Sequence, residues 1–462
     1  MDIRTGVSTF GPGEGLRRLA GFPFALLSWV GVDGYPVTAA VDFKVTADEE
    51  AADFIAPAGL DVPTDRELSL TGSHIRPQPG VGYDERRHVT VWGTATPTAL
   101  GGFSLRPTAA WGWDESTIPF PEYVERQVGQ SRRYLGKLSA ELGRPIRPRL
   151  SFGWLVLRAT RLPFLSATLI PVFIGLAIAA RQGFFDLPSA ILTAVGAAAV
   201  HLGLNVLNDV FDARLGADDK NVNPTKYSGG SRVIQYGLVP LRRMELIAFG
   251  LYAITIAIGV LLLLLRPSPA LLAIGVVGIL LSVSYTAPPV KLVYRGLGEI
   301  AVAIGFGPLM LVGAYVVQSG GSLTPEPFIA SIPIALLVAL ILYVNEIPDR
   351  AGDARAGKHT VPVRLPRGAV LNIYVAAAAG AFAAVVAGVV AGVLPLPALL
   401  ALLALPLLPR IVGGLRQNYE SPYGLMAVMA TNIRLHMYVG GLLLIGYLIA
   451  LAARFAFGLA GG

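Results

Sequence analysis

From about residue 161 to its end, the sequence is a succession of apolar runs separated by short polar loops. Each run is close to the ~20 residues that an α-helix needs to cross the ~30 Å hydrocarbon layer of a membrane. Backbone groups inside lipid must be satisfied within each segment, so these runs predict helices. We expect about nine of them, the eighth short enough to be tilted or partly re-entrant, at 162–180, 188–207, 245–265, 269–287, 298–317, 328–345, 370–393, 395–409 and 436–456.

The composition agrees with a membrane protein. Hydrophobic residues make up 53% of the 462 residues and charged residues 15%, whereas soluble domains carry about 25% charged residues. Disorder and a wholly soluble fold are therefore excluded. The chain has no cysteine, which excludes disulfides, thiolate zinc sites and iron–sulfur clusters.

The first 143 residues have a different pattern, and we expect a small, mainly-β cytoplasmic domain there. Residues 24–30 and 37–41 read as two strands around an Asp33-Gly34 turn. Residues 67–71 and 88–95 alternate like half-buried strands. Residues 119–142 read as a polar helix, 144–160 as a basic linker and 161–462 as the membrane domain.

Basic residues predict the orientation of the membrane domain. They concentrate in the loops after the second, fourth, sixth and eighth expected helices, while the other loops between the helices carry only Arg181 and Arg266. The excess of Lys and Arg in cytoplasmic loops places the N-terminal domain on the cytoplasmic side of the inner membrane. The start of the chain has no apolar stretch typical of a cleaved signal peptide. Because the basic residues lie between apolar runs, we expect membrane lipid and not nucleic acid as a partner.

Carboxylates of the apolar half gather in two short clusters at the cytoplasmic ends of expected helices. The first is Asn205-Val206-Leu207-Asn208-Asp209-Val210-Phe211-Asp212, and the second is Asn345-Glu346-Ile347-Pro348-Asp349-Arg350-Ala351-Gly352-Asp353. In each cluster the polar residues recur three or four apart, so they share one helical face. Charge at a membrane boundary is costly unless it is paired, hydrated or bound to metal, which makes both clusters functional candidates.

Two facing sets of carboxylates would repel each other without a cation. Oxygen ligands of this kind suit Mg²⁺, which commonly bridges to the phosphates of a substrate. Polar and basic residues follow each cluster, and together they describe a diphosphate site: Asp218, Lys226, Ser231 and Arg232 after the first, and Lys358 and Arg364 after the second.

Three other interpretations compete with a diphosphate site. Each cluster alone could be a solvated loop with helix caps, although two matched clusters disfavour this. A transporter would also carry intramembrane acids, but it would place them near the middle of helices. A flavin oxidoreductase domain on a helical membrane anchor would leave both clusters unexplained.

The membrane half resembles the UbiA superfamily of intramembrane prenyltransferases. Asn208-Asp209-Val210-Phe211-Asp212 matches its first aspartate motif, and Asp349 with Asp353, followed by Gly357-Lys358-His359-Thr360, matches its second. Tyr285-Thr286-Ala287-Pro288-Pro289 resembles the family segment after the fourth helix. The Asn345-Glu346 pair and Gly305-Phe306-Gly307-Pro308-Leu309 are most similar to the menaquinone branch, which prenylates 1,4-dihydroxy-2-naphthoate. The chain departs from the wider pattern at Gly216 and at Asn345-Glu346, where many members have aspartate.

This resemblance implies Mg²⁺-dependent transfer of a polyprenyl group from its diphosphate to an aromatic acceptor, with loss of CO₂ if the acceptor is dihydroxynaphthoate. Other acceptors in the superfamily remain open: 4-hydroxybenzoate, a porphyrin or a glycerol-phosphate lipid. The implied catalytic residues are Asp209, Asp212, Asp349, Asp353 and Lys358, and the implied metal ligands are Asn208 and the same four aspartates. The implied substrate-binding residues are Asn205, Asp218, Lys226, Ser231, Arg232, Tyr285, Asn345, Lys358 and Arg364.

The N-terminal domain resembles the pyridoxamine-phosphate-oxidase-like split barrels. This resemblance is carried by Phe24–Val37 and by Glu85–Thr94. It implies a bound FMN, whose phosphate Ser73, His74 and Arg76 are candidates to hold, against a surface-loop role for the same residues. It also implies a homodimer formed through this domain.

Overall fold

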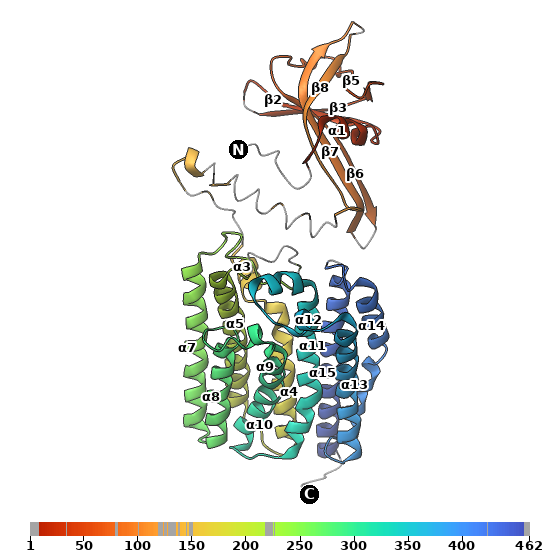
Figure 1. Ribbon diagram of the computed structural model, residues 1–462. Coiled ribbons are helices and arrows are strands. Elements are labelled where there is room, and N and C mark those ends of the chain that lie inside the picture. Colours follow the sequence, from red (N-terminus) through yellow and green to blue (C-terminus); the bar gives the residue numbers. More distant parts are fainter. Residues whose placement is uncertain are drawn as a thin grey trace. The chain divides into compact units, whose positions relative to one another are not determined.

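A computed structural model describes residues 9–456 with gaps at 34, 79–81, 100, 119–122, 124–126, 128–134, 137–138, 145, 147–150, 218–224, 226 and 423. The chain separates into two compact units, Met1–Ile146 and Arg147–Gly462. The first holds all the strands, and the second is helical (Figure 1). The expected helix over 119–142 lies largely outside the described residues.

The first unit is an antiparallel half-barrel sheet. Its strand order is β3-β2-β6-β7-β8-β5-β4, with β1 paired to β8. The strands are β1 (Thr9–Phe10), β2 (Ala25–Val30), β3 (Pro36–Val41), β4 (Phe43–Val45), β5 (Ala52–Phe54), β6 (Leu68–Gln78), β7 (Gly82–Pro97) and β8 (Phe103–Asp114).

The predicted strands 24–30 and 37–41 correspond to β2 and β3, and the predicted strands 67–71 and 88–95 lie within the longer strands β6 and β7. β2 and β3 pair around the predicted turn, with Ser28 opposite Thr38, and β6 pairs with β7. Short helix α1 (Pro12–Leu19) buries Leu16 and Leu19 in the same core as Leu27, Leu70 and Val91. The mainly-β domain that the alternating pattern predicted is therefore present.

The second unit is a bundle of long and short helices. They are α3 (Phe152–Ala159), α4 (Ser166–Arg181), α5 (Leu187–Leu215), α7 (Leu241–Leu265), α8 (Pro269–Ser284), α9 (Gly298–Ile304), α10 (Met310–Ser319), α11 (Pro325–Ala356), α12 (Val361–Arg364), α13 (Arg367–Val390), α14 (Leu407–Asn418) and α15 (Met426–Ala456). Shorter turns are η1 (Leu162–Leu165), η2 (Leu292–Arg295), η3 (Gly305–Leu309) and η4 (Leu396–Ala404). Residues 152–159, expected in the linker, form α3.

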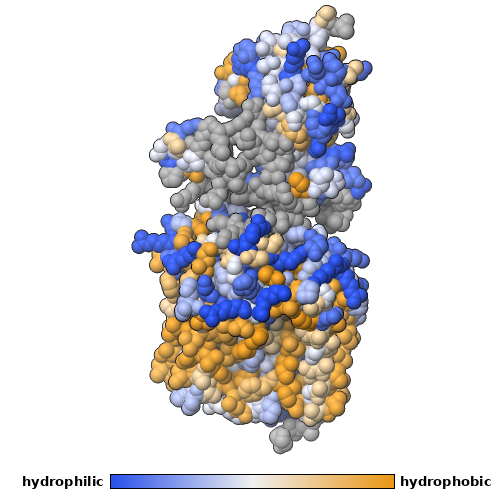
Figure 2. Space-filling model, in the orientation of Figure 1, coloured by the Kyte–Doolittle hydropathy of each residue, from blue (hydrophilic) through white to orange (hydrophobic). Residues whose placement is uncertain are grey.

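Within the described ranges, seven continuous helical stretches are long and apolar enough to cross a membrane. They are Leu187–Leu215, Leu241–Leu265, Gly298–Ser319, Pro325–Ala356, Arg367–Val390, Leu396–Asn418 and Met426–Ala456. The shorter apolar helices α4 and α8 occupy the positions of the first and fourth expected spans. On the face shown in Figure 2, an orange apolar band surrounds the helical unit below a rim of blue hydrophilic residues.

The structure differs from the expected spans in where helices end. The second and sixth were expected to stop at 207 and 345, but α5 and α11 continue through both acidic clusters to Leu215 and Ala356. Groups from other segments contact the aspartates of both clusters, so the two helices continue where hydropathy falls. The eighth span begins as the 3₁₀ segment η4, which contains Pro397 and ends before Pro406.

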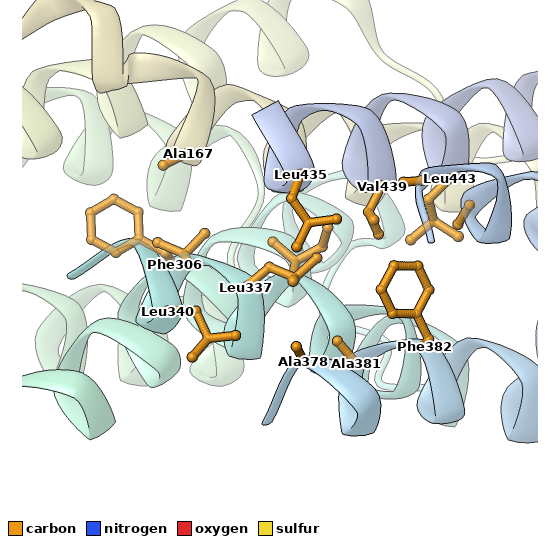
Figure 3. Packing of buried hydrophobic residues seen from close by; sticks show 14 of the residues in the cluster. Ala167, Phe306, Leu337, Leu340, Ala378, Ala381, Phe382, Leu435, Val439 and Leu443 are labelled. Carbon is orange, nitrogen blue, oxygen red and sulfur yellow. The ribbon is translucent and has the colours of Figure 1, made fainter. Parts of the chain in front are cut away.

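The bundle core lies where α4, η3, α11, α13 and α15 meet (Figure 3). Phe306, Leu337, Leu340 and Phe382 are among its buried members, and α11 contributes a large share of them. Small residues allow the close approach of backbones. A Cβ at Gly307 would lie 2.4 Å from the Cβ of Ala335, so η3 can pack against α11 only with glycine there.

A buried polar cluster ties helices together at the end of α5 and α11 opposite the acidic motifs. Arg181 Nη2 donates to both oxygens of Glu326, at 2.7 and 2.6 Å, and Gln182 Nε2 donates to Glu326 Oε2 at 2.8 Å. Tyr315 donates in turn to Gln182 Oε1 at 2.6 Å. Glu326 is 6% exposed, so its charge depends on these donors.

We expect Glu326→Ala to destabilise the bundle by about 3 kcal/mol, because it leaves the partly buried Arg181 guanidinium without its carboxylate. Thermal unfolding of the detergent-solubilised protein measures this loss. A change within 0.5 kcal/mol would contradict the interpretation, and Glu420→Ala, at an exposed ion pair with Arg350, is the control expected to show little change.

Candidate active site

Asp212 is the most heavily contacted carboxylate at the end of α5. Its Oδ2 accepts from Asn208 Nδ2 at 3.1 Å, one helical turn earlier. Its Oδ1 accepts from the Tyr294 hydroxyl at 3.1 Å and lies 3.0 Å from Lys358 Nζ. Asn208 is held in turn by the Thr286 hydroxyl, which donates to Asn208 Oδ1 at 2.6 Å. The predicted i, i+4 face of this helix is thus fixed by groups from two other segments.

Asp209 points into a different environment. Arg161 Nη2 lies 2.5 Å from Asp209 Oδ1, and the backbone N–H of Ser231 donates to Asp209 Oδ2 at 3.3 Å. The carbonyl of Ser231 accepts from Arg158 Nε at 2.9 Å. Asp209 is 2% exposed. This aspartate therefore fixes the segment after α5 against the start of the bundle.

The second motif lies in the last turns of α11. Asp349 Oδ2 accepts from the backbone N–H of Gly229 at 2.9 Å, and Asn345, Asp349 and Asp353 all line one cavity. Helix α11 ends at Gly357, whose φ of +76° reverses the chain. That reversal brings Lys358 back over Asp353, with 3.9 Å between Nζ and Oδ1.

Lys358 is the residue that joins the two motifs. Its ammonium group contacts Asp212 of α5 and Asp353 of α11, and 12% of its side chain is exposed. It also lies 5.1 Å from the centroid of the Tyr294 ring. The two acidic clusters thus face each other, with a single buried cation between an aspartate of each.

A polar cavity of about 190 Å³ lies between the motifs. Its polar lining comes from α5 and α11, from the segments that follow α5, α8 and α11, and from the residue before η1: Arg161, His201, Asn205, Asn208, Asp212, Tyr227, Ser228, Tyr285, Asn345, Glu346, Asp349, Asp353, Lys358 and Thr360. Asp209 is absent from this lining. The cavity therefore combines carboxylate oxygens, two cations and backbone amides around a space large enough for a few phosphate-sized groups.

The donor set fits Mg²⁺ in one particular way. Among the residues that the structure describes, no three His, Asp or Glu side chains are close enough to form a complete metal cage. Asn208 and Asp212 on one side, and Asp349 and Asp353 on the other, instead offer two pairs of oxygen donors around one cavity. Mg²⁺ is commonly held by one or two carboxylates and completes its shell with water and substrate phosphates, so two such pairs suit it.

An apolar cavity of about 480 Å³ adjoins the polar one. Residues of α5, α7, α8 and α10 line it, including Val200, Ile258, Gly278 and Val317. Five residues line both cavities: His201, Leu204, Tyr285, Val302 and Phe306. The two spaces therefore meet at a boundary that contains three aromatic rings.

The π-helical turn η3 brings Phe306 to this boundary. Such turns insert one extra residue into a helix and frequently occur at functional sites. The ring of Phe306 lies edge-on to His201, with 5.4 Å between centroids. The Nδ1 atom of His201 lies 2.8 Å from the hydroxyl of Thr168, and this contact fixes the orientation of the ring.

Several predicted substrate-binding residues lie outside the cavity lining. Ser231 contacts Asp209 through its backbone N–H. The guanidinium carbon of Arg232 lies 5.9 Å from the centroid of the Tyr236 ring. Arg364 is exposed beside Gly296. Asp218 and Lys226 lie outside the described residues. Asn205, Tyr285, Asn345 and Lys358 do line the cavity.

The structure also brings in residues that the sequence patterns did not single out. Arg161, Tyr294 and Thr286 contact the aspartate motif of α5 directly. Thr286 lies in a segment quoted for the family resemblance, but nothing in its spacing identified a partner. Tyr294 stands in a 3₁₀ turn with no periodic signal.

The flavin candidates lie on the long β6–β7 hairpin. Arg76 Nη1 is 2.9 Å and His74 Nε2 is 3.5 Å from the carboxylate of Glu85 on the neighbouring strand. Ser73 stands opposite His88 in the same ladder. FMN binding and a homodimer through this unit stay predictions.

Comparison with known proteins identifies the helical unit. A model of the UbiA prenyltransferase family matches residues 168–433. The chain belongs to this family. It is 26% identical over 300 residues to the 1,4-dihydroxy-2-naphthoate octaprenyltransferase of Bacillus subtilis, covering 65% of this chain and 94% of that protein. It is 25% identical over 299 residues to the 2-carboxy-1,4-naphthoquinone phytyltransferase of Synechocystis, covering 63% and 92%.

Solved structures of UbiA homologs also align with the chain. The apo structure from Aeropyrum pernix aligns with a TM-score of 0.49 at 20% identity, covering 61% of this chain and 98% of the homolog. A homolog from Archaeoglobus fulgidus, solved with DMAPP and Mg²⁺, aligns with a TM-score of 0.40 at 16% identity, covering 66% and 98%. The family match over residues 168–433 and the apolar helices together identify the chain as a membrane-type UbiA-family prenyltransferase with an N-terminal half-barrel domain.

We expect Arg161→Gln to cost about 2 kcal/mol of stability, because it leaves the buried Asp209 carboxylate without its cation. Differential scanning fluorimetry of the purified protein in detergent measures the change. Arg161→Lys keeps a charge and should recover part of the loss. Equal melting temperatures for wild type and Arg161→Gln would show that the ion pair does not stabilise the fold.

Proposed function

We propose that the protein catalyses Mg²⁺-dependent transfer of a polyprenyl group from polyprenyl diphosphate to an aromatic acceptor, 1,4-dihydroxy-2-naphthoate, in menaquinone biosynthesis. The observation that carries this proposal is the pair of facing carboxylate motifs around one polar cavity, with Lys358 between them. The adjoining apolar cavity gives the same site room for a hydrocarbon tail. The names of the Bacillus subtilis and Synechocystis relatives support the naphthoate acceptor.

The carboxylates would hold the metal and the cations would bind the phosphates. The cavity lining offers Mg²⁺ the side-chain oxygens of Asn208, Asp212, Asp349 and Asp353. The carboxylate of Asp209 would also bind Mg²⁺ once it releases Arg161. When bound, Mg²⁺ supplies Lewis-acid stabilisation of the leaving diphosphate. Lys358 and Arg161 are placed to neutralise the phosphate oxygens, a form of preorganised electrostatic catalysis.

The apolar cavity would hold the prenyl tail and exclude water. The reacting allylic carbon joins tail to diphosphate, so it must lie where the two cavities meet. His201, Tyr285 and Phe306 line that boundary. Aromatic faces stabilise a nearby cation, and a dry boundary protects the allylic cation from hydrolysis.

The bond changes balance without a further reactant. The ring carbon that carries the carboxylate of dihydroxynaphthoate attacks the allylic carbon, and the carbon–oxygen bond to diphosphate breaks with its electron pair on oxygen. The carboxylate then leaves as CO₂, and its bonding pair restores the aromatic ring. The products are a prenylated diol, CO₂ and diphosphate.

The basic loops support a cytoplasmic location for this site. Basic residues gather at the ends of α5 and α11 that carry the motifs, including Arg214 in the last turn of α5 and Arg242 and Arg243 in the first turn of α7. Positive loops face the cytoplasm. We therefore propose that both substrates are bound at the cytoplasmic side of the inner membrane.

We expect Asp212→Asn and Asp349→Asn each to lower Mg²⁺-dependent prenyl transfer at least 100-fold, because each removes a negative oxygen donor from one side of the cavity. The transfer rate is measured with the protein in nanodiscs, by mass spectrometry of the product formed from geranyl diphosphate and dihydroxynaphthoate. The control is Asp186→Asn at the other end of α5, where asparagine can replace the Asp186 cap. Wild-type rates in both site variants would refute the proposal.

We expect Gly278→Phe to impair transfer of long prenyl chains while sparing short ones. Gly278 lines the apolar cavity and a Cβ there meets open space, so the phenyl ring would occupy volume needed by the tail. The KM for farnesyl diphosphate should rise about 10-fold or more, and that for dimethylallyl diphosphate should stay within twofold. Gly250→Phe on the exposed face of α7, away from the cavity lining, is the matched control.

A further inference from the structure

Three residues of the polar cavity present buried polar atoms without hydrogen-bond partners among the described residues. They are both carboxyl oxygens of Glu346, which lies beside the carboxyl of Glu299, the side-chain oxygen of Asn345 and Nε2 of His201. All three residues line the polar cavity, and Glu346 and His201 are 5% and 4% exposed. A buried polar atom without a partner costs free energy, so native structures rarely keep several together. A ligand in this cavity would satisfy them.

These atoms lie deeper in the bundle than the carboxylates proposed to hold metal. Along α11, Glu346 precedes Asp349 by three residues, which is about 4.5 Å of helical rise. Along α5, His201 precedes Asp209 by eight residues, about 12 Å. His201 also lines the apolar cavity. The three residues therefore surround the point where a prenyl diphosphate would react. This point lies further into the bundle than the carboxylates that would bind its phosphates through metal.

The chemistry of the three groups indicates what they bind. Glu346 and Asn345 offer oxygens, which accept hydrogen bonds, and the neighbouring carboxyl groups of Glu346 and Glu299 together disfavour an anion. A phosphate or a carboxylate of the ligand would be unfavourable against Glu346. Hydroxyl groups suit it, because each O–H donates to an oxygen, and hydrogen bonds to charged groups are among the stronger ones.

We infer that Glu346, together with Asn345 and His201, binds the hydroxyl groups of the acceptor and so selects an aromatic diol. The inference rests on the proposed prenyl transfer and adds the residues that choose its acceptor. A hydroxyl hydrogen-bonded to Glu346 fixes the ring beside the allylic carbon, and it raises electron density at the ring carbon next to that hydroxyl. The acceptor's own carboxylate then turns away from Glu346.

Glu346→Gln in the full-length protein tests this role. Gln keeps the size of the side chain but replaces one accepting oxygen with an NH₂ donor. We expect the KM for 1,4-dihydroxy-2-naphthoate to rise about 10-fold or more, as for loss of a hydrogen bond to a charged group. The KM for geranyl diphosphate should stay within twofold, because its phosphates do not contact Glu346.

A second acceptor separates recognition from damage to the fold. Wild type should use 1-hydroxy-2-naphthoate, which lacks one hydroxyl, at least 10-fold less efficiently than the diol, and Glu346→Gln should reduce this preference to about threefold or less. The control is Glu326→Gln, the same change at a buried glutamate of the same helix that contacts Arg181 and lines neither cavity. It should leave the acceptor preference unchanged.

The outcomes distinguish this inference from the proposed function. Equal loss of kcat/KM for both acceptors, or a raised KM for geranyl diphosphate, would overturn the role of Glu346 while prenyl transfer stands. If Glu346→Gln does not fold, Glu346→Asp, which keeps two accepting oxygens, must retain the diol preference, and its loss would also overturn the inference. A wild-type protein that transfers no prenyl group to any aromatic acceptor would instead refute the proposed function.

Discussion

Repulsion between two carboxylate-bearing helix ends is the constraint on which this site depends. α5 and α11 both end in aspartates at the same side of the bundle, and a low-dielectric surrounding makes like charges costly. Lys358 relieves this repulsion by contacting Asp212 and Asp353 together. Gly357 makes that contact geometrically possible, because its left-handed backbone turns the chain back over the end of α11. A cation and a reversal of the chain thus hold the motifs at a distance that suits a charged ligand.

The polar and apolar cavities work as one space because single helices line both. α5 carries His201 at the boundary between the cavities and Asp212 in the polar cavity. The rise of this helix therefore sets the distance between the boundary and the carboxylate. The π-helical turn η3 adds Phe306 at the same boundary, and Gly307 lets that turn pack against α11. A rigid core of α4, α11, α13 and α15 supports this arrangement. Helix packing therefore sets the two cavities, and the segments that follow α5, α8 and α11 supply contacts that hold the carboxylates.

Much of this could be predicted from particular residues. The spacing of Asn208 and Asp212 predicted a shared helical face, and the two side chains are hydrogen-bonded at 3.1 Å. Apolar runs predicted a helical membrane domain, and the Asp33-Gly34 turn predicted the pairing of β2 with β3. Helix ends were less predictable, because hydropathy falls at the motifs while tertiary partners keep α5 and α11 helical. Arg161 and Tyr294 were missed as site residues because their partners are distant in sequence.

The sequence by itself determined which segments are helices or strands and which residues carry charge, because periodicity and residue chemistry are local properties. It placed Asp209 and Asp212 together as equivalent members of one motif. Only the tertiary structure separated them, with Asp209 held by Arg161 and Asp212 in the cavity. It alone also placed Glu346 beside the carboxyl of Glu299 with no donor to its oxygens among the described residues, since that depends on which side chains from remote helices come within hydrogen-bonding distance.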